Sequence, residues 1–584
     1  MAVFNVTQSI LGREWVWRGG IAPDAGASGD NDLTAQLFRA RGANPADFDR
    51  LRAPTLRDWL PDPSIFRDMD TAATRIADAV AAAENIVIYG DYDVDGATSA
   101  ALLVRLLRGC GAHAGYYIPD RLLEGYGPSA NAMVALGQAG ADLVVTVDCG
   151  IQGFEACAAA KAANVDVIIV DHHQASTALP LAVAVVNPNR LDEAEGASFG
   201  HLAAVGVAFV LGVALLRTLR GRGWFADRAE PRILDLLDIV ALGTVADVVP
   251  LTGLNRAFVT QGLKVMAARR NIGMNALIDV AKIERAPTPH DLGFALGPRI
   301  NAGGRVGKSD LGVRLLSCDD PDEATSLAAE LDRLNQERRM IEADVTTEAL
   351  EMAAASANSA VAIVAGAGWH PGVIGIVASR VKDRCHRPAI VFALQDDGTA
   401  KGSGRSVPGV DLGGAVLAAK DSGLLIAGGG HAMAAGLTVE ATKIAALTEF
   451  LNARLGADVA QSQTTSALTV DAALAPRGVN LALVESLDAA GPYGQGWAAP
   501  RVASGPWTMV KCDIVGESHV RAILSGADGA RIKAMAFRAA DTPLGVAMVS
   551  AGKRPVYVAG RVKRDDWGRT PAAELHLDDL AFAD

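Results

Sequence analysis

Short apolar runs alternate with helical segments between residues 84 and 190, and this alternation predicts the central layer of the fold. Runs of strand length lie at 86–89 (IVIY), 142–147 (DLVVTV) and 165–170 (VDVIIV). Helical segments separate them, so their order predicts βαβ units and a parallel sheet. The carboxyl ends of parallel strands lie at one edge of the sheet, where ligands bind.

Acidic and imidazole side chains follow each of these runs: Asp91, Asp93, Asp95, Asp148, Asp171, His172 and His173. In an extended loop, the alternate positions 91, 93 and 95 would face the same side. Neighbouring carboxylates repel one another unless a cation lies among them, and their oxygens suit Mg²⁺ or Mn²⁺. A solvated turn or a helix cap would explain any one of these residues, but three successive strand ends favour a metal site.

A largely apolar segment at 233–251 is expected to be helical, and it contains Asp247. A carboxylate among apolar neighbours is costly unless it is paired or bound to a metal. Two interpretations of Asp247 therefore remain open at this point, a buried salt bridge and a metal ligand.

The segment from 323 to about 356 has the polar surface and apolar spacing of one long helix. Its spacing is close to 3.5 residues, which would also suit a coiled-coil strand, but Arg338 interrupts the apolar stripe and favours a single interdomain helix. A second α/β unit follows, with strands expected at 361–365 and 389–394 and a helix at 373–381.

Three glycine-containing segments of this second unit, at 369–372, 402–406 and 428–431, are expected to be loops. Glycine loops expose backbone N–H groups, and here they lie beside serine, arginine and histidine. Such loops are suited to holding a phosphate.

The polar stretch 458–465 predicts a linker, and short alternating segments beyond it, at 520–524, 531–537 and 556–562, predict a small β-barrel. Residues 501–584 carry twelve Lys and Arg against ten Asp and Glu, whereas the whole chain has a net charge of −12. The negative overall charge argues against a basic, nucleic-acid-binding surface along the whole chain. The small local excess of positive charge in residues 501–584 agrees with a barrel that binds nucleic acid.

Composition and length narrow the possible number of domains and the cellular compartment. A chain of 584 residues, half of them hydrophobic, predicts several domains, each with its own core. Six scattered cysteines without a CxxC pair indicate a reduced, cytoplasmic protein. Arg13 and Glu14 interrupt any N-terminal signal sequence, and the apolar stretch 202–216 is shorter than the roughly 20 residues that span a bilayer. We therefore expect no membrane association.

The segments 91–96 (DYDVDG), 147–150 (VDCG), 171–173 (DHH) and 243–247 (GTVAD) resemble, in order and context, the four motifs of the DHH phosphoesterase superfamily. Further segments resemble its RecJ branch, the single-strand-specific 5′→3′ exonucleases: 297–305 (GPRINAGGR), 370–375 (HPGVIG), 402–406 (GSGRS), 429–436 (GGHAMAAG) and 492–496 (PYGQG). Gly303 departs from the alanine that is more common in that family. The first 60 residues match weakly, and their role is open beyond a covering or packing extension.

The resemblance implies an α/β fold: a parallel-sheet DHH domain joined by a long helix to a smaller DHH-associated α/β domain, then a C-terminal OB-type β-barrel. The implied boundaries are an N-terminal extension at 1–65, the DHH domain at 66–320, the helix at 321–357, the second domain at 358–460 and the barrel at 466–584.

The resemblance also implies a catalytic site with two Mn²⁺ or Mg²⁺ ions, held by Asp93, Asp95, Asp148, His172 and Asp247. Asp148 would bridge the ions, Asp91 and His173 would lie further out or contact the scissile phosphate, and the histidine ligand favours Mn²⁺. Residues implied to hold DNA or its 5′-phosphate are Arg121, Arg299, Asn301, Arg305, His370, Ser403, Arg405, Gly429, Gly430 and His431.

The implied activity is hydrolysis of single-stranded DNA from the 5′ end to mononucleotides, in DNA repair and recombination, by a monomer aided by a helicase and a single-strand-binding protein. One alternative is a DHH phosphodiesterase acting on nano-RNA or cyclic dinucleotides, although such relatives are shorter and lack the barrel. Another is an inactive DHH scaffold, which would require lost ligands.

Overall fold

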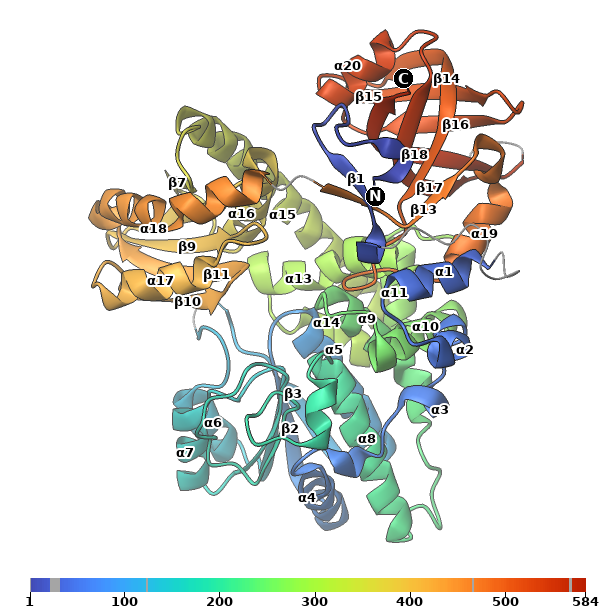
Figure 1. Ribbon diagram of the computed structural model, residues 1–584. Helices are drawn as coiled ribbons and strands as arrows, with labels where there is room; N and C mark the ends of the chain where they lie inside the picture. The colour runs from blue at the N-terminus through green and yellow to red at the C-terminus, as the bar shows by residue number, and fades with distance from the viewer. Residues whose placement is uncertain (1, 21–31, 122–123, 465–466, 567–569, 584) are drawn as a thin grey trace. The chain divides into compact units, whose positions relative to one another are not determined.

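The computed structural model describes residues 2–20, 32–121, 124–464, 467–566 and 570–583 (Figure 1). The chain forms two compact units. One contains residues 62–247 and 262–465, and the other contains residues 1–61, 248–261 and 466–584.

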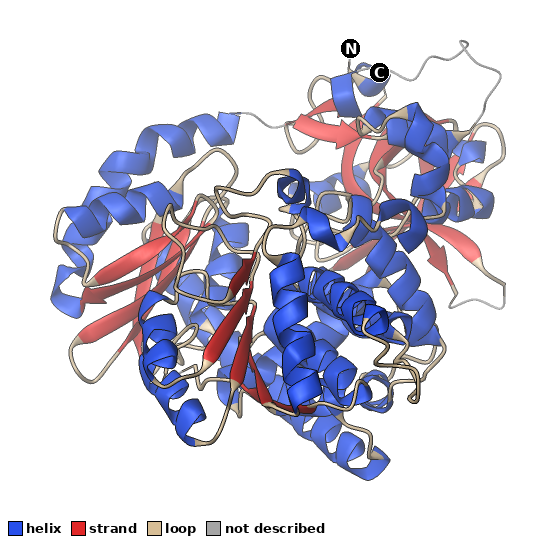
Figure 2. Cartoon of the chain, turned by 90° about the horizontal axis from the view of Figure 1, so that it is seen from below, coloured by secondary structure: helices blue, strands red, loops and turns tan. Residues whose placement is uncertain are grey.

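The core of the first unit is a five-stranded sheet with the order β3-β2-β4-β5-β6, in which all neighbours are parallel. Its strands are β2 (Asn85–Gly90), β3 (His113–Tyr117), β4 (Leu143–Val147), β5 (Asp166–Val170) and β6 (Ala184–Val186). Val144 and Ile169 pack with α6 (Ala130–Gln138) and α7 (Phe154–Ala162) on one face, and α5 (Val94–Gly109) and α8 (Ala204–Gly221) contact the sheet as well. Figure 2 shows the strands between layers of helices. The predicted parallel sheet is confirmed.

Two details of this region differ from the expectation. Helix α5 begins at Val94, so Asp95 lies in its first turn and not in an extended loop. Helix α9 (Leu237–Ala246) ends before Asp247, which is its C-cap and not an interior residue. In both cases the acidic residue lies at a helix end, where some backbone groups have no partner within the helix.

Further helices complete this part of the unit: α4 (Met69–Ala82), α11 (Ile272–Val280), α12 (Pro289–Asp291), α13 (Gly297–Val306) and α14 (Leu311–Ser317). By length and composition α8 is apolar enough to cross a membrane, and 72% of it is buried inside the protein.

The predicted long helix is α15 (Pro321–Ala355), with 35 residues. Asp320 caps its first turn by accepting hydrogen bonds from the backbone N–H groups of Asp322 and Glu323. Arg338, the charge in its apolar stripe, is buried and pairs with Glu342 at 2.7 Å. Because the charge is neutralised on the same helix, α15 can pack its buried side against α11, α13 and α16 (Ile374–Cys385).

The second sheet of this unit has the order β10-β11-β9-β8-β7. Its strands are β7 (Ala362–Ala367), β8 (Ala389–Leu394), β9 (Thr399–Arg405), β10 (Ala427–His431) and β11 (Ala434–Glu440), and only β7 and β8 are parallel. The expectation that 402–406 and 428–431 are loops was wrong, since β9 and β10 contain most of both segments. Their glycines permit tight packing, and a Cβ on Gly402 would clash with the ring of Phe392.

The helices α17 (Leu412–Asp421) and α18 (Ile444–Thr464) cover this sheet. The prediction of a linker at 458–465 was wrong for residues 458–464, because α18 continues to Thr464. Thr465 lies outside the described residues. The helix persists because its apolar stripe, which includes Leu451, Leu455 and Val459, remains buried.

The second unit contains a closed five-stranded barrel, in which β14, β15, β16, β18 and β17 pair in turn and β17 returns to β14. The strands are β14 (Val502–Val515), β15 (His519–Gly526), β16 (Arg531–Ala536), β17 (Val556–Asp565) and β18 (Ala572–Phe582), with α20 (Pro543–Ser550) after β16. The predicted OB-type barrel is confirmed.

The N-terminal segment belongs to this barrel unit. Strand β1 (Glu14–Trp17) pairs in parallel with β12 (Ala467–Val470), which precedes β13 (Ala472–Leu474) and α19 (Leu481–Ala489). The indole of Trp15 is fully buried, and its Nε1 donates to Asp579 at 3.1 Å.

The short helices α1 (Leu33–Ala40), α2 (Phe48–Arg52) and α3 (Leu56–Trp59) follow. Arg256, at the start of α10 (Gly253–Ala267), donates to the carbonyl oxygens of Leu51 and Ala490.

Candidate metal centre

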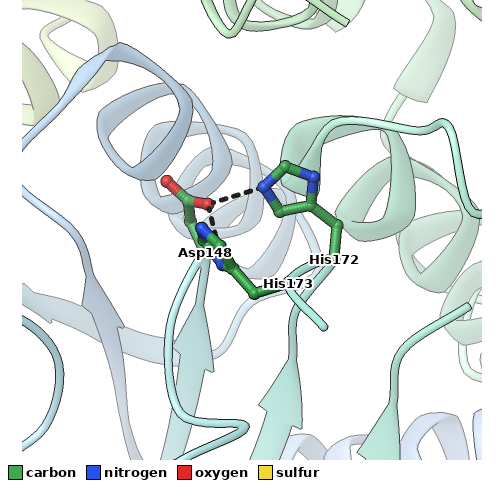
Figure 3. Close-up of side chains that lie close together, drawn as sticks. All are labelled: Asp148, His172 and His173. Atoms are coloured by element: carbon green, nitrogen blue, oxygen red, sulfur yellow. Dashed lines mark ion pairs between the residues drawn. The ribbon is translucent and has the colours of Figure 1, made fainter. Parts of the chain in front are cut away.

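Asp148, His172 and His173 follow neighbouring strands β4 and β5, and their side chains converge at the carboxyl edge of the first sheet (Figure 3). The Nε2 atom of His172 lies 3.3 Å from Asp148 Oδ1, and His173 Nδ1 lies 4.0 Å from the same oxygen. Asp148 itself has a left-handed backbone conformation, with φ of 60°. Such strain in an aspartate persists where the surroundings require one side-chain position, as at functional sites.

The loop after β2 brings three more carboxylates to this edge. Asp93 is the N-cap of α5, and its Oδ1 accepts a hydrogen bond from the N–H of Gly96 at 3.0 Å. A Cβ on Gly96 would clash with the backbone of Asp91. Glycine at position 96 therefore lets the loop fold tightly against the first turn of the helix.

Asp95 is fixed by the start of another helix. Its two carboxylate oxygens accept hydrogen bonds from the N–H groups of Ala204 at 2.6 Å and Val205 at 2.9 Å, in the first turn of α8. The positive end of the helix dipole favours the charged carboxylate there. Asp95 Oδ2 is also 3.9 Å from His172 Nε2, and Asp247 Oδ2 is 3.8 Å from His172 Nδ1.

Asp171 holds the DHH segment itself. Its buried carboxylate accepts hydrogen bonds from the N–H groups of Ile151, His172 and His173, and from His173 Nδ1 at 2.7 Å. Burial alone would raise the pKa of Asp171, but the bond with His173 brings it below its usual value. The same bond outweighs burial at His173 and raises the pKa of that imidazole.

The other carboxyls of this centre destabilise one another's charged forms. Burial is the main cause that raises the pKa of Asp91 to about 8, of Asp95 to about 6 and of Asp247 to about 9, and it also raises that of Asp148. The charge of Asp93 adds to each of these shifts, whereas His172 opposes the shift at Asp95. Asp91 Oδ1 and Asp247 Oδ2 are buried without a hydrogen-bond partner in the described part of the chain. Crowded carboxylates with orphaned oxygens require a positive charge.

The donor set fits divalent metal ions. Within the described residues, three groups of side chains bring ligand atoms within 4.8 Å of one another: Asp148, His172 and His173; Asp95, His172 and Asp247; Asp91, Asp93 and Asp148. Asp148 and His172 each belong to two groups, which is what a pair of adjacent ions with shared ligands would need. Oxygen ligands with one or two imidazoles suit Mn²⁺, and Mg²⁺ to a lesser degree.

Three arginines lie near this acidic centre without an ion-pair partner in the described ranges: Arg121, Arg305 and Arg405. Burial, and then repulsion from Arg121, lowers the pKa of Arg305 to about 10 and also lowers that of Arg405. Arg405 Nη1 donates to Ser403 Oγ at 3.1 Å, and Arg305 Nη1 donates to the Gly372 oxygen at 2.8 Å. A partly buried group of cations without counter-charges is suited to a phosphate.

The surface beside Ser403 and Arg405 is open. Cross-strand pairs align Ser403 with Gly436 and Gly429, and Arg405 with Ala434 and then His431. A Cβ on Gly429 or Gly436 would meet nothing within 4 Å. Bare backbone in these strands leaves space next to the two polar side chains, although the strands are not the loops that the sequence suggested.

Other predicted DNA contacts have different surroundings. Arg299 forms an ion pair with Asp332 at 2.9 Å, so its charge is already balanced. His370 accepts a hydrogen bond from the N–H of Gly372 at 3.0 Å, and burial lowers its pKa. Asn301 lies half-buried on α13, and Gly430 adopts φ of 151° in β10, where a Cβ would clash with Ala434.

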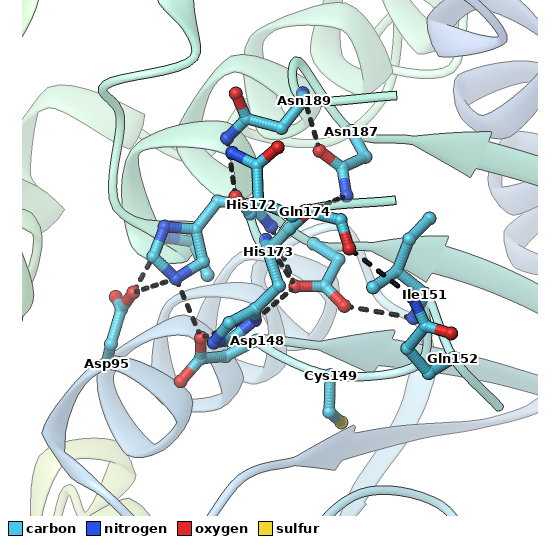
Figure 4. A network of polar contacts seen from close by, with 12 residues as sticks. Asp95, Asp148, Cys149, Ile151, Gln152, His172, His173, Gln174, Asn187 and Asn189 are labelled. Carbon is cyan, nitrogen blue, oxygen red and sulfur yellow. Dashed lines mark hydrogen bonds and ion pairs between the residues drawn. The ribbon is translucent and has the colours of Figure 1, made fainter. Parts of the chain in front are cut away.

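Several residues at the centre were missed by the sequence interpretation. Asn187 and Asn189 donate to the main-chain oxygens of His173 at 2.9 Å and His172 at 2.5 Å (Figure 4). The hydroxyl of Tyr126 donates to the main-chain oxygen of Asp148 at 3.3 Å. The sequence did contain a signal, because the segment 187–189 (NPN) directly follows the apolar run of β6 at the same sheet edge.

Family models match three consecutive parts of the chain: the DHH family N-terminal domain at 85–244, the DHHA1 domain at 357–457 and the RecJ OB domain at 470–579. The single-stranded-DNA-specific exonuclease RecJ of Dickeya dadantii is 41% identical over 510 residues, covering 85% of this chain and 87% of the relative. The chain belongs to the RecJ family.

Other RecJ proteins can be aligned with this chain over a greater length. The RecJ of Escherichia coli, also described as a single-stranded-DNA-specific exonuclease, is 36% identical over 568 residues, covering 94% of this chain and 95% of its own. The crystal structure of RecJ with Mn²⁺ from Thermus thermophilus superposes with a TM-score of 0.75 at 29% identity, covering 94% of this chain and 76% of that one. A second structure of that protein contains Mg²⁺. RecJ proteins thus bind the two ions that this donor set suits.

Proposed function

We propose that this protein hydrolyses single-stranded DNA from its 5′ end and releases 5′-mononucleotides. The observation that carries the proposal is the pair of complementary charge clusters in one unit, the acidic centre around Asp148 and the unpaired arginines beside it. The acidic centre supports phosphodiester hydrolysis, and the arginines support recognition of a chain end. The curated relatives, which are named as exonucleases specific for single strands, supply the substrate class.

The protein's own residues have distinct tasks in this reaction. Asp93, Asp95, Asp148, His172 and Asp247 hold the ions, and Asp148 is the proposed bridge between them. Bound Mn²⁺ or Mg²⁺ would lower the pKa of a water and stabilise charge on the phosphate. His173, whose pKa is raised by its bond with Asp171, would contact a phosphate oxygen, and Asp91 would support the ligands from further out.

Polarity requires a second site, because a metal centre alone cleaves whichever phosphodiester is placed in it. We assign the terminal 5′-phosphate to Arg405, Ser403 and Arg121. Arg405 offers a planar pair of donors, and the negative charge of a bound phosphate would offset the desolvation that lowers its pKa. Arg305 and the remaining predicted contacts, Arg299, Asn301, His370, Gly429, Gly430 and His431, are proposed to guide the strand that follows.

The proposal extends to the setting in the cell. A nuclease for single strands needs a source of unpaired DNA, so we expect a helicase and a single-strand-binding protein as partners in DNA repair and recombination. We also propose that the protein is a cytoplasmic monomer. The cysteines of the described chain are all free, which is typical of reducing compartments.

The test uses oligonucleotides labelled at the 5′ or the 3′ end, single-stranded or annealed, in Mn²⁺, Mg²⁺ or EDTA. We expect immediate release of 5′-labelled mononucleotide, progressive shortening of the 3′-labelled strand, and no reaction on blunt duplex or in EDTA. Asp148→Asn, which keeps the side-chain volume, should remove cleavage while preserving DNA binding. Mononucleotides released first from a 3′-labelled end would refute the polarity, and cleavage in EDTA would refute the metal mechanism.

A further inference from the structure

The segment 492–496 (PYGQG) runs into a closed turn of the barrel unit. Gly494 and Trp497 exchange both backbone hydrogen bonds, at 3.1 and 3.3 Å. The buried indole of Trp497 packs against Phe38, with ring centroids 5.8 Å apart. The core cluster around Trp15 contains none of these residues, so the turn has its own support. The proposed metal and phosphate sites do not include this turn, and its sequence needs another explanation.

The turn holds residues 248–251, which directly follow the proposed metal ligand Asp247. Asp247 is the last residue of its segment of the first unit, and the chain enters the barrel unit with the next residue. The N–H of Leu251 donates to the oxygen of Gln495 at 2.8 Å, and the N–H of Asp247 donates to the oxygen of Gly243 at 2.9 Å. Residues 248–251 are therefore a tether, held by α9 before Asp247 and by the turn after it.

The turn also contacts this tether through Gly496. This glycine has φ of 67°, and a Cβ on it would lie 2.8 Å from the Cβ of Pro250. Asn255 Nδ2 donates to the oxygen of Pro250 at 3.0 Å. Because Pro250 is enclosed from both sides, a larger residue at position 496 would displace the tether.

The backbone of the tether is strained at the residue next to Asp247. Val248 has φ of 63°, and among the described non-glycine residues with positive φ it is the only one branched at Cβ. Its side chain is 62% exposed, so packing of that side chain does not impose the conformation. A β-branched residue remains in this region only where its surroundings require it. The anchors on both sides of Val248 supply that requirement.

The carboxylate of Asp247 has less support from its own contacts than the other proposed ligands have. Asp93 and Asp95 accept hydrogen bonds from backbone N–H groups. The Nδ1 atom of His172 lies 3.0 Å from a backbone oxygen. In contrast, Asp247 Oδ2 is buried without a hydrogen-bond partner in the described part of the chain. The direction of this carboxylate therefore depends on its backbone.

We propose that residues 248–251 position the Asp247 carboxylate for metal binding, with Val248 as the positioning residue and the turn at 494–497 as its anchor. The inference rests on the proposed function, which makes Asp247 a metal ligand, and it adds the residues that direct this ligand. A side chain that already has the binding direction loses little freedom when the ion binds. Loosening the tether should therefore lower the metal affinity.

The first test compares two substitutions of Val248 in the full chain. Val248→Gly removes the restriction on the backbone, so the Mn²⁺ affinity of the apoprotein, measured by electron paramagnetic resonance of the free ion, should fall about tenfold. Val248→Ala keeps a Cβ and should retain the affinity. In EDTA the melting temperature of Val248→Gly should be unchanged, because relief of strain offsets the added freedom. A purely structural role would instead lower that temperature and leave the affinity intact.

The second test displaces the anchor and leaves the sequence of the tether unchanged. Gly496→Ala should also lower the Mn²⁺ affinity about tenfold, because the added Cβ displaces Pro250. Gly529→Ala is the matched control in the same unit. Gly529 has φ of 83°, but an added Cβ would meet nothing within 4 Å. This control introduces the same kind of backbone strain and should bind Mn²⁺ as the unsubstituted protein does.

Asp247→Asn separates the inference from the function on which it rests. If this variant loses Mn²⁺ affinity but Val248→Gly and Gly496→Ala do not, the tether is refuted and Asp247 remains a ligand. Unchanged affinity in Asp247→Asn would refute both the ligand and its tether. If all three variants lose affinity but the unsubstituted protein fails to cleave single-stranded DNA in Mn²⁺, the proposed function fails and the tether stands.

Discussion

The side-chain nitrogen of Asn189 donates a hydrogen bond of 2.5 Å to the main-chain oxygen of His172, and a second of 2.9 Å to the oxygen of Gly200. His172 Nδ1 in turn lies 3.0 Å from the oxygen of Leu202. A carbonyl oxygen can only accept, so Nδ1 carries the proton and Nε2 presents its lone pair to the metal centre. Asn189 thus fixes the backbone of His172, and Leu202 fixes the tautomer of its imidazole.

Replacing Asn189 by Asp should weaken metal binding with little change in side-chain volume. The carboxylate has no donor for the oxygens of His172 and Gly200, so the imidazole loses its fixed direction. Loss of such an outer partner usually lowers metal affinity about 10- to 100-fold. Titration of the apoprotein with Mn²⁺, followed by electron paramagnetic resonance of the free ion, measures this affinity directly.

The control for this experiment is Asn358→Asp, which makes the same chemical change away from the metal centre. Its Mn²⁺ affinity should equal that of the unsubstituted protein. If Asn189→Asp lowered the melting temperature but left the Mn²⁺ affinity intact, Asn189 would be a residue of the fold alone.

The metal-free protein should lose stability as pH rises. Asp95, Asp91 and Asp247 have folded pKa values of about 6, 8 and 9, all above their ordinary 3.8. A carboxyl with a raised folded pKa binds more protons in the folded chain, so the free energy of unfolding falls between the unfolded and folded pKa values. In EDTA, the melting temperature should therefore fall between pH 5 and pH 9, by about 2 °C or more.

Two further experiments identify which groups cause the melting temperature to fall with rising pH. Mn²⁺ should raise the melting temperature more at pH 8 than at pH 5, because the ion competes with protons for the same oxygens. Asp247→Asn should flatten the decline above pH 7 in EDTA, since it removes the group with a pKa of about 9. A decline of equal steepness in that variant would mean that other groups cause it.

Arg405→Ala should lower cleavage chiefly on strands that carry a 5′-phosphate. Loss of a bidentate charged contact costs about 1.5–3 kcal/mol, so kcat/KM on 5′-phosphorylated strands should fall roughly tenfold to a hundredfold. On 5′-hydroxyl strands the activity should change little, and Mn²⁺ affinity should be unaltered. Steady-state kinetics on matched 5′-phosphate and 5′-hydroxyl oligonucleotides give the comparison.

Arg384→Ala provides the control, because Arg384 is exposed on α16 in the same domain. It should leave both substrates unaffected. An equal loss on both substrates in Arg405→Ala would show that this arginine orients the strand in general and does not recognise its end.

The sequence placed the acidic and imidazole side chains at one sheet edge, but it did not identify the residues that hold them. Asp148 and His172 each follow an apolar run directly, so the rule for parallel strands places them at one edge. The amide partners of Asp95 come from Ala204, more than one hundred residues later, and local patterns contain no information about that pairing. The glycine segments of β9 and β10 were mistaken for loops because small residues lack the branched side chains that usually indicate strands.

The N-terminal segment is another case in which a residue's partner lies too far along the chain for local patterns to predict it. Strand β1 pairs with β12 about 450 residues further along, so nothing in the first 60 residues could identify its partner. The pairing also changes how the barrel can be tested. Removing the chain after residue 465 would leave Trp15 and its neighbours without the strands that bury them, and binding defects would then reflect misfolding as well as lost contacts.

Trp15→Ala should therefore destabilise the barrel unit and leave the metal centre intact. The indole is fully buried, packs with Leu468, Val470 and Ala559, and donates to the buried carboxylate of Asp579. Truncating such a side chain costs about 3–5 kcal/mol. Limited proteolysis should show faster cleavage within residues 467–583, while Mn²⁺ affinity and cleavage of very short strands persist. Trp15→Phe, which keeps most of the volume but loses the donor, should have an intermediate effect. If Trp15→Ala left proteolysis of the barrel unchanged, the N-terminal segment would be an accessory layer and not part of the barrel's core.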